Sequence, residues 1–295
     1  MEAVTAEYIR RLGEDMVTKD PGPGKKLKNL SDVTFKCFYG KIQEEILEIW
    51  NMCHRHIPKT TIKHLLWSLM YMKLYNPIDV MAVMADTCKN TFLKWVWKWV
   101  DCIAERRDEV IVWNKRYRGA PNDTWCHVSV DGTDFQIGEP TPFDKCWKSP
   151  KAKGAAVKYE VAVSIFMGDI VWIYGPHVGS KSDIKIFNEK LRNMLKPQEM
   201  VEVDAGYKGN KEFFRSRDDW KTEKEKREKS DVRARHETVN RRFKIWGILH
   251  QQFRNDKKRH QSVFTAIAVM TQLDIDGGRV LFHVEYSKRK ESKHG

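Results

Sequence analysis

The sequence comprises 295 residues, of which 53 are Lys or Arg and 40 are Asp or Glu, so its formal net charge is +13. Hydrophobic residues make up 41%, enough for a substantial core, and the lack of a long apolar run excludes a membrane-spanning protein. The surplus of positive charge favours an anionic partner, usually nucleic acid, although ribosomal, membrane-surface and simply basic proteins share it.

Cysteine usage indicates the compartment. The six cysteines are scattered and form no CxxC pair, which is typical of reduced thiols in an intracellular protein. His54 and His56 follow Cys53, but no second pair of ligands stands at finger spacing, so a zinc site is not expected. We expect a nuclear protein if the source is eukaryotic, which the basic run at residues 257–260 would suit, and a cytoplasmic protein otherwise.

The N-terminal part of the chain is predicted to contain two kinds of segment. Residues 1–28 combine mixed charge with the breaker cluster PGPGKK, which predicts a flexible leader. Residues 29–118 carry apolar side chains at three- and four-residue steps, so we expect a helical region there.

Three helices of that region follow one another closely. A helix that starts at Ile62 and a short helix that starts at Ile78 precede a longer helix from about Asn90. This order is typical of a helix-turn-helix unit, in which Lys94 and Lys98 on the polar side of the last helix would contact DNA. A plain three-helix bundle that packs against the next domain explains the same pattern, and both interpretations stay open.

The spacing of apolar residues changes from a helical repeat to an every-second-residue repeat at the start of the second domain, which we place at residues 124–285. Alternating apolar residues indicate strands. We expect a first strand that ends at Asp131 and returns as a hairpin through DFQIGEP, then an antiparallel hairpin around Gly168. A helix over residues 182–195 and a buried strand at residues 200–204 suggest a β-α-β crossover, which makes that strand parallel to the first.

The rest of this domain is predicted to be mainly helical. Residues 233–246 and 262–273 have helical spacing, RVLFHVEY after them could form a last strand, and residues 286–295 predict a basic, frayed tail. The expected fold class is therefore α/β, a mixed sheet with flanking helices, preceded by an all-α helix-turn-helix region.

Three acidic residues occupy positions at the end of a predicted strand or on the polar face of a predicted helix. Asp131 closes the run HVSVD, Asp204 closes MVEVD, and Glu237 lies on the polar face of the helix over residues 233–246. A lone Asp at a strand end is usually a turn or cap residue. Three together in a basic surround indicate a cage of carboxylate oxygens, which prefers Mg²⁺ or Mn²⁺ over zinc.

Such a cage suits phosphoryl transfer on nucleic acid. Two metal ions held ~3.5–4 Å apart by shared carboxylates stabilise both the attacking and the leaving oxygen at phosphorus. We therefore assign Asp131, Asp204 and Glu237 as catalytic and metal-binding residues. Asp134 is the one rival to Asp131, but three residues along a strand place it on the other face.

Positive charge gathers beside these acids. A lysine-rich loop around Trp147 could hold phosphates while Trp147 stacks on an unpaired base, although a solvated loop with a buried Trp explains it as well. Asp183 could orient the site or belong to the first turn of the helix over residues 182–195, and we favour the helix position. His236 could assist proton transfer or form a structural hydrogen bond, and we favour the hydrogen bond. The predicted DNA contacts in this domain are Lys145, Lys148, Lys151, Lys153, Arg241 and Lys244.

The three acids and the residues around them resemble a known family. Asp131, Asp204 and Glu237, with 32 residues between the last two, stand in VSVDGTDF, VDAGYKG and RARHETVNRRFK. These phrases are similar to the catalytic core of DDE-type transposases of the DDE superfamily endonucleases, among which the Harbinger-like group and related bacterial insertion-sequence enzymes are nearest. The resemblance covers roughly residues 60–285.

This resemblance implies a fold and an activity. The fold would be ribonuclease-H-like, with the three acids holding the metal ions. The activity would be cutting at terminal inverted repeats and joining the freed 3′ hydroxyl to target DNA. Partners would be further copies of the chain, because two ends must be held together, and in the Harbinger-like group also a separate helper protein.

One segment departs from the family pattern. A ribonuclease-H-like core has a fifth strand between its second and third acids, but residues 215–235 are highly charged and lack a strand-like run. Either the strand is very short or a helical excursion replaces it, and we favour the excursion. Two other functions remain open. One is a domesticated, catalytically silent DNA-binding protein on the same scaffold, and the other is an interaction module whose basic face binds a protein or RNA.

Overall fold

The computed structural model describes residues 3–18, 30–204, 207, 212–215, 220 and 222–286. The chain forms two compact units, each built from segments that are far apart in the sequence. The first unit comprises Met1–Arg107, Phe243–Gln251 and Ser262–Met270, and the second comprises Asp108–Arg242, Gln252–Gln261 and Thr271–Gly295. No helix within the described ranges is long and apolar enough to cross a membrane.

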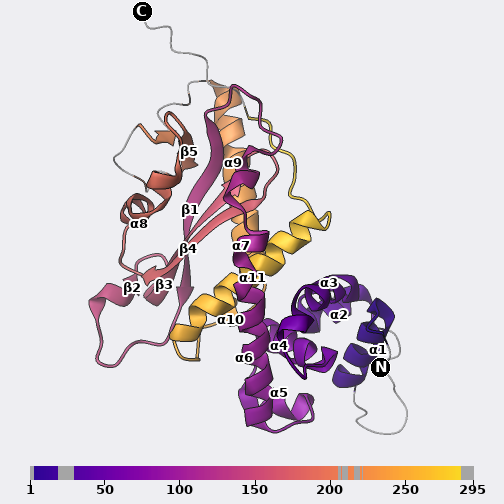
Figure 1. Ribbon diagram of the computed structural model, residues 1–295. Coiled ribbons are helices and arrows are strands. Elements are labelled where there is room, and N and C mark those ends of the chain that lie inside the picture. The colour runs from indigo at the N-terminus through magenta and orange to yellow at the C-terminus, as the bar shows by residue number, and fades with distance from the viewer. Residues whose placement is uncertain are drawn as a thin grey trace, which may run out of the picture. The chain divides into compact units, whose positions relative to one another are not determined.

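The first unit is helical where it is described, and Figure 1 shows its elements. Its helices are α1 (Ala6–Val17), α2 (Asp32–Tyr39), α3 (Gln43–Cys53), η1 (His54–His56), α4 (Ile62–Leu74), α5 (Ile78–Met84), α6 (Lys89–Glu105), α10 (Gly247–His250) and the middle of α11 (Lys258–Asp276).

Helix α1 corrects the expectation of a flexible leader. The Thr5 side chain accepts the N–H of Tyr8 and so caps the helix, and Ile9 is fully buried. At Gly13 an added Cβ would lie 2.7 Å from the Phe35 ring, so the absence of a side chain lets α1 pack closely against α2. Residues 6–17 are therefore part of the core of the first unit, while PGPGKK lies outside the described residues.

Helices α4, α5 and α6 occur in the predicted order, and residues 85–88 connect the short helix to the long one. Phe92 and Trp99 of α6 are fully buried and so belong to the core of the first unit. Lys94 and Lys98 are exposed on the other side, and Lys98 Nζ lies 4.8 Å from the centre of the Trp95 ring.

The second unit contains the sheet. Its strands are ordered β2-β3-β1-β5-β6, and β4 also pairs with β3. β1 pairs antiparallel with β3 and parallel with β5, which confirms the predicted mixed sheet and is consistent with a ribonuclease-H-like fold. The strands are β1 (Cys126–Gln136), β2 (Lys148–Ser149), β3 (Gly154–Ser164), β4 (Ile170–Val178), β5 (Met200–Val203) and β6 (Phe214–Arg215).

Several boundaries differ from the sequence-based prediction. The segment DFQIGEP does not return as a hairpin, because β1 continues straight on to Gln136 along β3. A two-residue strand, β6, pairs with β5, so the fifth strand is very short and is not replaced, as we had favoured, by a helical excursion, although α9 does make residues 223–235 helical. Residues 279–286 (RVLFHVEY) form no strand. The predicted helix at residues 182–195 is split into α8 (Asp183–Glu189) and η4 (Leu191–Met194).

The other connecting elements of the second unit are short, apart from one long helix. Helix α9 (Glu223–Lys244) begins ten residues before the range 233–246 that its apolar spacing predicted. The short elements are α7 (Arg107–Val110), η2 (Trp113–Tyr117) and η3 (Lys145–Trp147).

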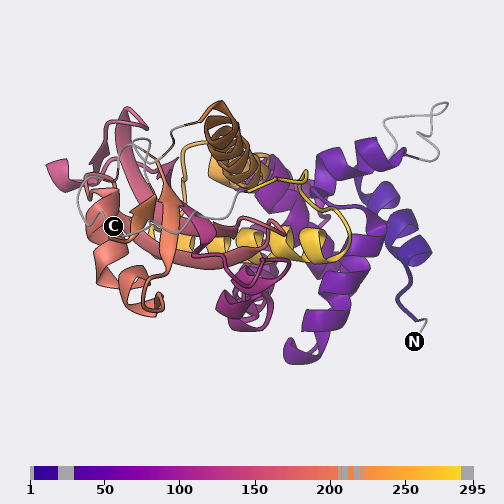
Figure 2. The same ribbon diagram turned by 90° about the horizontal axis from the view of Figure 1, so that it is seen from above.

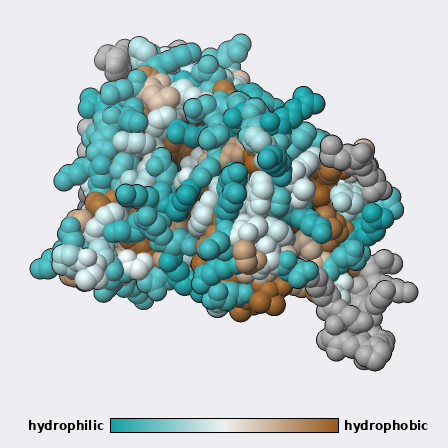
Figure 3. All heavy atoms as spheres, turned by 60° about the horizontal axis from the view of Figure 1, so that its bottom comes forward, coloured by the Kyte–Doolittle hydropathy of each residue, from teal (hydrophilic) through white to brown (hydrophobic). Residues whose placement is uncertain are grey.

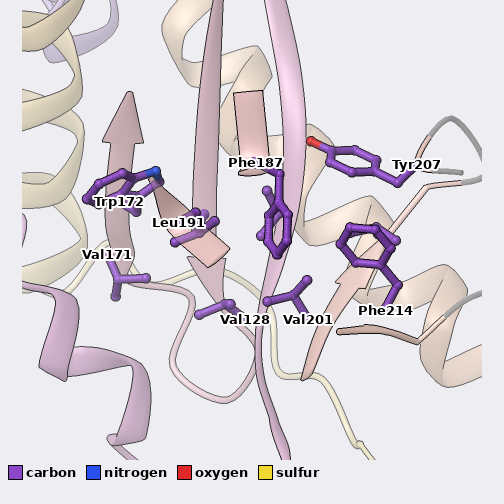
Figure 4. Packing of buried hydrophobic residues seen from close by; sticks show 11 residues of the cluster. Val128, Val171, Trp172, Phe187, Leu191, Val201, Tyr207 and Phe214 are labelled. Atoms are coloured by element: carbon purple, nitrogen blue, oxygen red, sulfur yellow. The ribbon is translucent and has the colours of Figure 1, made fainter. Parts of the chain in front are cut away.

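Helices cover both faces of the sheet (Figure 2). Successive side chains of β1 point to opposite faces and so contact different helices. Val128 and Val130 face α8 and pack with Phe187, whose ring is 4.8 Å from that of Phe214. Figure 4 shows this apolar cluster on β1, β5 and the helical segment that follows β4. Ser129 points to the other face, where its hydroxyl lies 2.9 Å from Nδ1 of His236 in α9.

Candidate active site

The first two predicted acids occupy neighbouring positions on adjacent strands, where β5 ends and β1 continues to Gln136. Val130 pairs with Val203 in the parallel ladder of β1 and β5, so Asp131 and Asp204 come next on adjacent strands. Asp131 is half-buried, and its Oδ1 accepts the N–H of Gly132 at 2.8 Å. Asp204 is more open, with 45% of its side chain exposed.

Helix α9 carries the third acid and is fastened to both strands. The Ser129–His236 contact joins it to β1, and Lys229 joins it to β5 through an ion pair of 3.1 Å with Glu202. Burial raises the pKa of Glu202 to about 7, an effect that Lys229 opposes. Glu237 follows His236 directly, and 60% of its side chain is exposed.

His236 gives a further measure of how these groups are arranged. Burial lowers the pKa of its imidazole, while the nearby carboxylates of Asp131 and Glu237 act in the opposite direction. The imidazole is therefore within electrostatic reach of the first and third acids, and its hydrogen bond to Ser129 agrees with the structural role that we favoured for it.

Arg233 links the second acid to the third. Its Nη1 lies 3.5 Å from Asp204 Oδ1, and its Nε lies 3.2 Å from Glu237 Oε1. Because Arg233 stands one turn before Glu237 on α9, its guanidinium can reach both carboxylates. The sequence analysis did not single out this residue, although its i, i+4 spacing from Glu237 was visible.

The arrangement of the carboxylates is open. Within the described ranges, no group of three His, Cys, Asp or Glu residues is close enough together to hold a metal ion, at the acids or around Cys53. Asp204 and Glu237 share a guanidinium, and Asp131 accepts a backbone N–H. Three carboxylates are nevertheless the donors that Mg²⁺ and Mn²⁺ prefer, and two of these already attract a cation, so the chemistry of the donor set fits a hard divalent ion.

Asp183 faces the strand that bears Asp131. It lies in the first turn of α8, as expected, but its Oδ1 is 3.1 Å from Lys158 Nζ. A Cβ added at Gly132 would come within 2.4 Å of the same oxygen. The carboxylate therefore fills the space beside Gly132, the residue that follows Asp131 in β1.

A buried carboxyl group that the sequence analysis missed lies next to Gly132. Glu160 of β3 pairs with Gly132 and accepts the indole N–H of Trp172 at 3.0 Å. Burial raises its pKa to about 8, so it is neutral at neutral pH. Tyr207 is also buried, and its pKa is raised by burial and then by carboxylates that include Glu160 and Asp183. An acidic residue inside the apolar run KYEVAVS was the available signal.

The predicted basic loop approaches β1 at one point. Lys151 Nζ donates to the carbonyl of Gly132 at 3.0 Å. Trp147 is half-buried, with Lys257 Nζ 4.4 Å from the centre of its ring, so a cation already covers one face of the indole. The other predicted DNA contacts of the second domain that are exposed are Lys145, Lys148, Lys153, Arg241 and Lys244.

One face of the molecule is mostly polar. The face drawn in Figure 3 is mostly hydrophilic, and its described hydrophobic residues form small patches.

Asp134, the rejected rival of Asp131, is buried and accepts a hydrogen bond from the hydroxyl of Ser149, and burial raises its pKa. It therefore holds β2 through Ser149.

Comparison with known proteins identifies the domain. Residues 130–272 match the family model of the DDE superfamily endonuclease, and this range contains Asp131, Asp204 and Glu237. No curated protein and no solved structure matches the chain. Through residues 130–272 the chain is therefore a member of the DDE superfamily endonuclease family, as its resemblance to DDE-type transposases predicts.

Proposed function

We propose that this protein is a metal-dependent DNA transposase or endonuclease that cuts at transposon ends and joins the freed 3′ hydroxyls to target DNA. The observation that carries the proposal is the position of the three acids within the family match. Asp131 and Asp204 occupy adjacent positions on parallel strands, and Glu237 lies on a helix that is fastened to both strands.

The residues of the chain would share the chemistry. Mg²⁺ or Mn²⁺, bound by the three acids, would polarise the scissile phosphate and activate the attacking oxygen. Asp131 would be the most rigid ligand, because it is half-buried and hydrogen-bonded to its own strand. Asp204 and Glu237 are more exposed and would complete the site after leaving Arg233.

DNA would be held by basic residues of both units. In the second unit the exposed lysines near Trp147, together with Arg241 of α9, would bind phosphates, and so would Lys244, a residue at the end of α9 that falls in the first unit. In the first unit, α5 and α6 would act as a helix-turn-helix with Lys94 and Lys98 toward DNA. The substrates would be terminal inverted repeats and target DNA, and the working form would be a homo-oligomer.

A Harbinger-like subtype, with a helper protein and action in the nucleus, is part of the same proposal. It rests on the phrases around the three acids that the sequence analysis identified, and on the basic run at residues 257–260.

One observation favours a second function. Asp204 and Glu237 share an arginine, and the described residues do not bring three metal ligands together. A catalytically silent DNA-binding protein on the same scaffold would tolerate that arrangement, because it needs positive charge and no metal.

A nicking assay separates the two functions. Supercoiled plasmid DNA and DNA that ends in inverted repeats are incubated with the full chain in Mg²⁺, in Mn²⁺ or in EDTA. We expect nicking with either ion and none in EDTA. Salt-sensitive binding to the same DNA without nicking in any of the three buffers would support the silent protein instead.

A further inference from the structure

Arg233 contacts two of the three proposed catalytic acids at once. It is 3.5 Å from Asp204 and 3.2 Å from Glu237. Two carboxylates that approach each other repel, and a fixed positive charge between them removes that repulsion. A divalent cation bound by either acid would compete with the guanidinium for the same carboxylate, because bound divalent ions dominate the local electrostatics of such sites.

Three other cations near the acids are held by different partners. Lys229 pairs with Glu202 at 3.1 Å, Lys158 pairs with Asp183 at 3.1 Å, and Lys151 donates to a backbone carbonyl at 3.0 Å. These lysines therefore support the surrounding strands. In the described part of the second unit, the guanidinium that contacts both Asp204 and Glu237 is that of Arg233.

The ion pairs of Arg233 with Asp204 and Glu237 are exposed to solvent and therefore weak. The side chains of Arg233 and Glu237 are each 60% exposed, and that of Asp204 is 45% exposed. Exposed ion pairs contribute little to stability, because water and salt screen them and two long side chains must be held still. The guanidinium can move into solvent without disturbing the buried residues that anchor α9, among them Val232 and Val239.

We propose that Arg233 pairs with Asp204 and Glu237 in the metal-free protein, and that divalent cations bound by these acids displace it. The inference rests on the proposed function. Arg233 is then a competitor of the metal: it keeps the two acids together while it lowers their affinity for a divalent ion. If Arg233 instead positioned the acids for the metal, its removal would weaken metal binding.

Manganese binding to the full chain tests this directly, with no need for activity. Electron paramagnetic resonance of free Mn²⁺ gives the dissociation constant for wild type, Arg233→Gln and Arg233→Lys. The control is Arg227→Gln, which removes the same charge from an exposed position on another face of α9. We expect Arg233→Gln to bind Mn²⁺ about three- to tenfold more tightly, and the other two variants to stay within about twofold of wild type.

The outcomes separate this inference from the proposed function. If Arg233→Gln binds Mn²⁺ no more tightly than wild type, while Asp204→Asn in the wild-type background loses binding, the displacement model is wrong and the metal site stands. If no variant shows binding that depends on Asp204, both are wrong. Thermal unfolding of each variant without metal checks that the fold is unchanged.

Discussion

Gly132 follows Asp131 in β1, and its lack of a side chain leaves the space that Asp183 fills. A Cβ there would lie 2.4 Å from Asp183 Oδ1, closer than any normal contact. The neighbouring groups are also constrained, because Glu160 pairs with Gly132 from β3 and Lys158 holds Asp183. A single methyl group at this position is therefore expected to disturb the part of β1 that carries Asp131, the first of the proposed catalytic acids.

We expect Gly132→Ala to lower the free energy of unfolding by about 1–3 kcal/mol, because an overpacked site must shift its neighbours. Urea unfolding measures the change. Gly154→Ala is the matched control, since an added Cβ at that strand residue meets no atom within 4 Å and should change stability by less than about 0.5 kcal/mol. Equal effects of the two substitutions would show that Asp183 does not fill the space beside Gly132.

Glu160 predicts a pH dependence of stability. Its pKa is raised by burial from its ordinary value of 4.5 to about 8, so between these values the folded protein keeps a proton that the unfolded chain releases. Stability should therefore fall as pH rises from 5 to 8, by on the order of 3 kcal/mol from this residue.

Glu160→Gln keeps an acceptor for the Trp172 indole but cannot ionise. We expect its stability to fall less than that of wild type over the same pH range, as measured by urea unfolding at pH 5 and pH 8. A loss of stability as large as that of wild type would mean that Glu160 is already ionised in the folded protein.

At the scale of elements, the positions of β5 and α9 decide where the second and third acids lie. Glu199, directly before β5, forms a buried ion pair with Arg116 of η2, with Nε 2.7 Å from Oε1. Both side chains are almost fully buried, at 2% and 4% exposure. The start of β5 is thus tied to the linker between the helical region and the sheet.

Breaking this pair should be costly, because it leaves a buried charge without a partner. We expect Arg116→Met to lower the free energy of unfolding by about 3–5 kcal/mol, as measured by urea unfolding. The double variant Arg116→Met with Glu199→Leu should recover part of that loss, since neither charge remains. Additive losses in the double-mutant cycle would contradict the ion pair.

The sheet and the position of Asp204 directly after β5 were predictable because local patterns encode them, whereas Asp131 lies in the middle of β1 and not at its end as predicted. Asp131 and Asp204 close alternating apolar runs, and the turn at Gly168 marks the β3–β4 hairpin. The exact length of β1 and the strand β6 were not predictable, because pairing with a neighbouring strand, not local sequence, stabilises them. The early start of α9 was missed for a related reason: its first turns are charged and carry little apolar periodicity.

Functional partners were harder to find than the acids. Arg233 and Glu160 acquire their roles from residues that are distant in sequence or on another strand, namely Asp204 and Gly132. The spacing of apolar residues along the sequence does not predict contacts of this kind. The assignment of Glu237 depended on the family resemblance as much as on its own helix.

At the scale of the whole molecule, the net charge of +13 predicts salt-sensitive binding to DNA. We expect affinity for duplex DNA to fall steeply with salt, and the double variant Lys148→Gln with Lys153→Gln to lower the slope of log K against log salt by about two, one for each lost phosphate contact. Fluorescence anisotropy across a salt series measures the slope. Lys185→Gln, an exposed lysine of α8, is the control and should leave it unchanged. A slope that is unaltered in the double variant would remove the basic loop from the DNA path.

The most direct measurement is the rate of Mg²⁺-dependent DNA nicking by wild type, Asp204→Asn and Asp231→Asn. Asp231 is exposed on α9 and has no assigned role, so its variant controls for the loss of one negative charge. We expect Asp204→Asn to lose about a hundredfold or more of the rate, because an amide cannot replace an ionised ligand, and Asp231→Asn to retain wild-type activity. Equal nicking by Asp204→Asn and wild type would contradict catalysis by the three carboxylates.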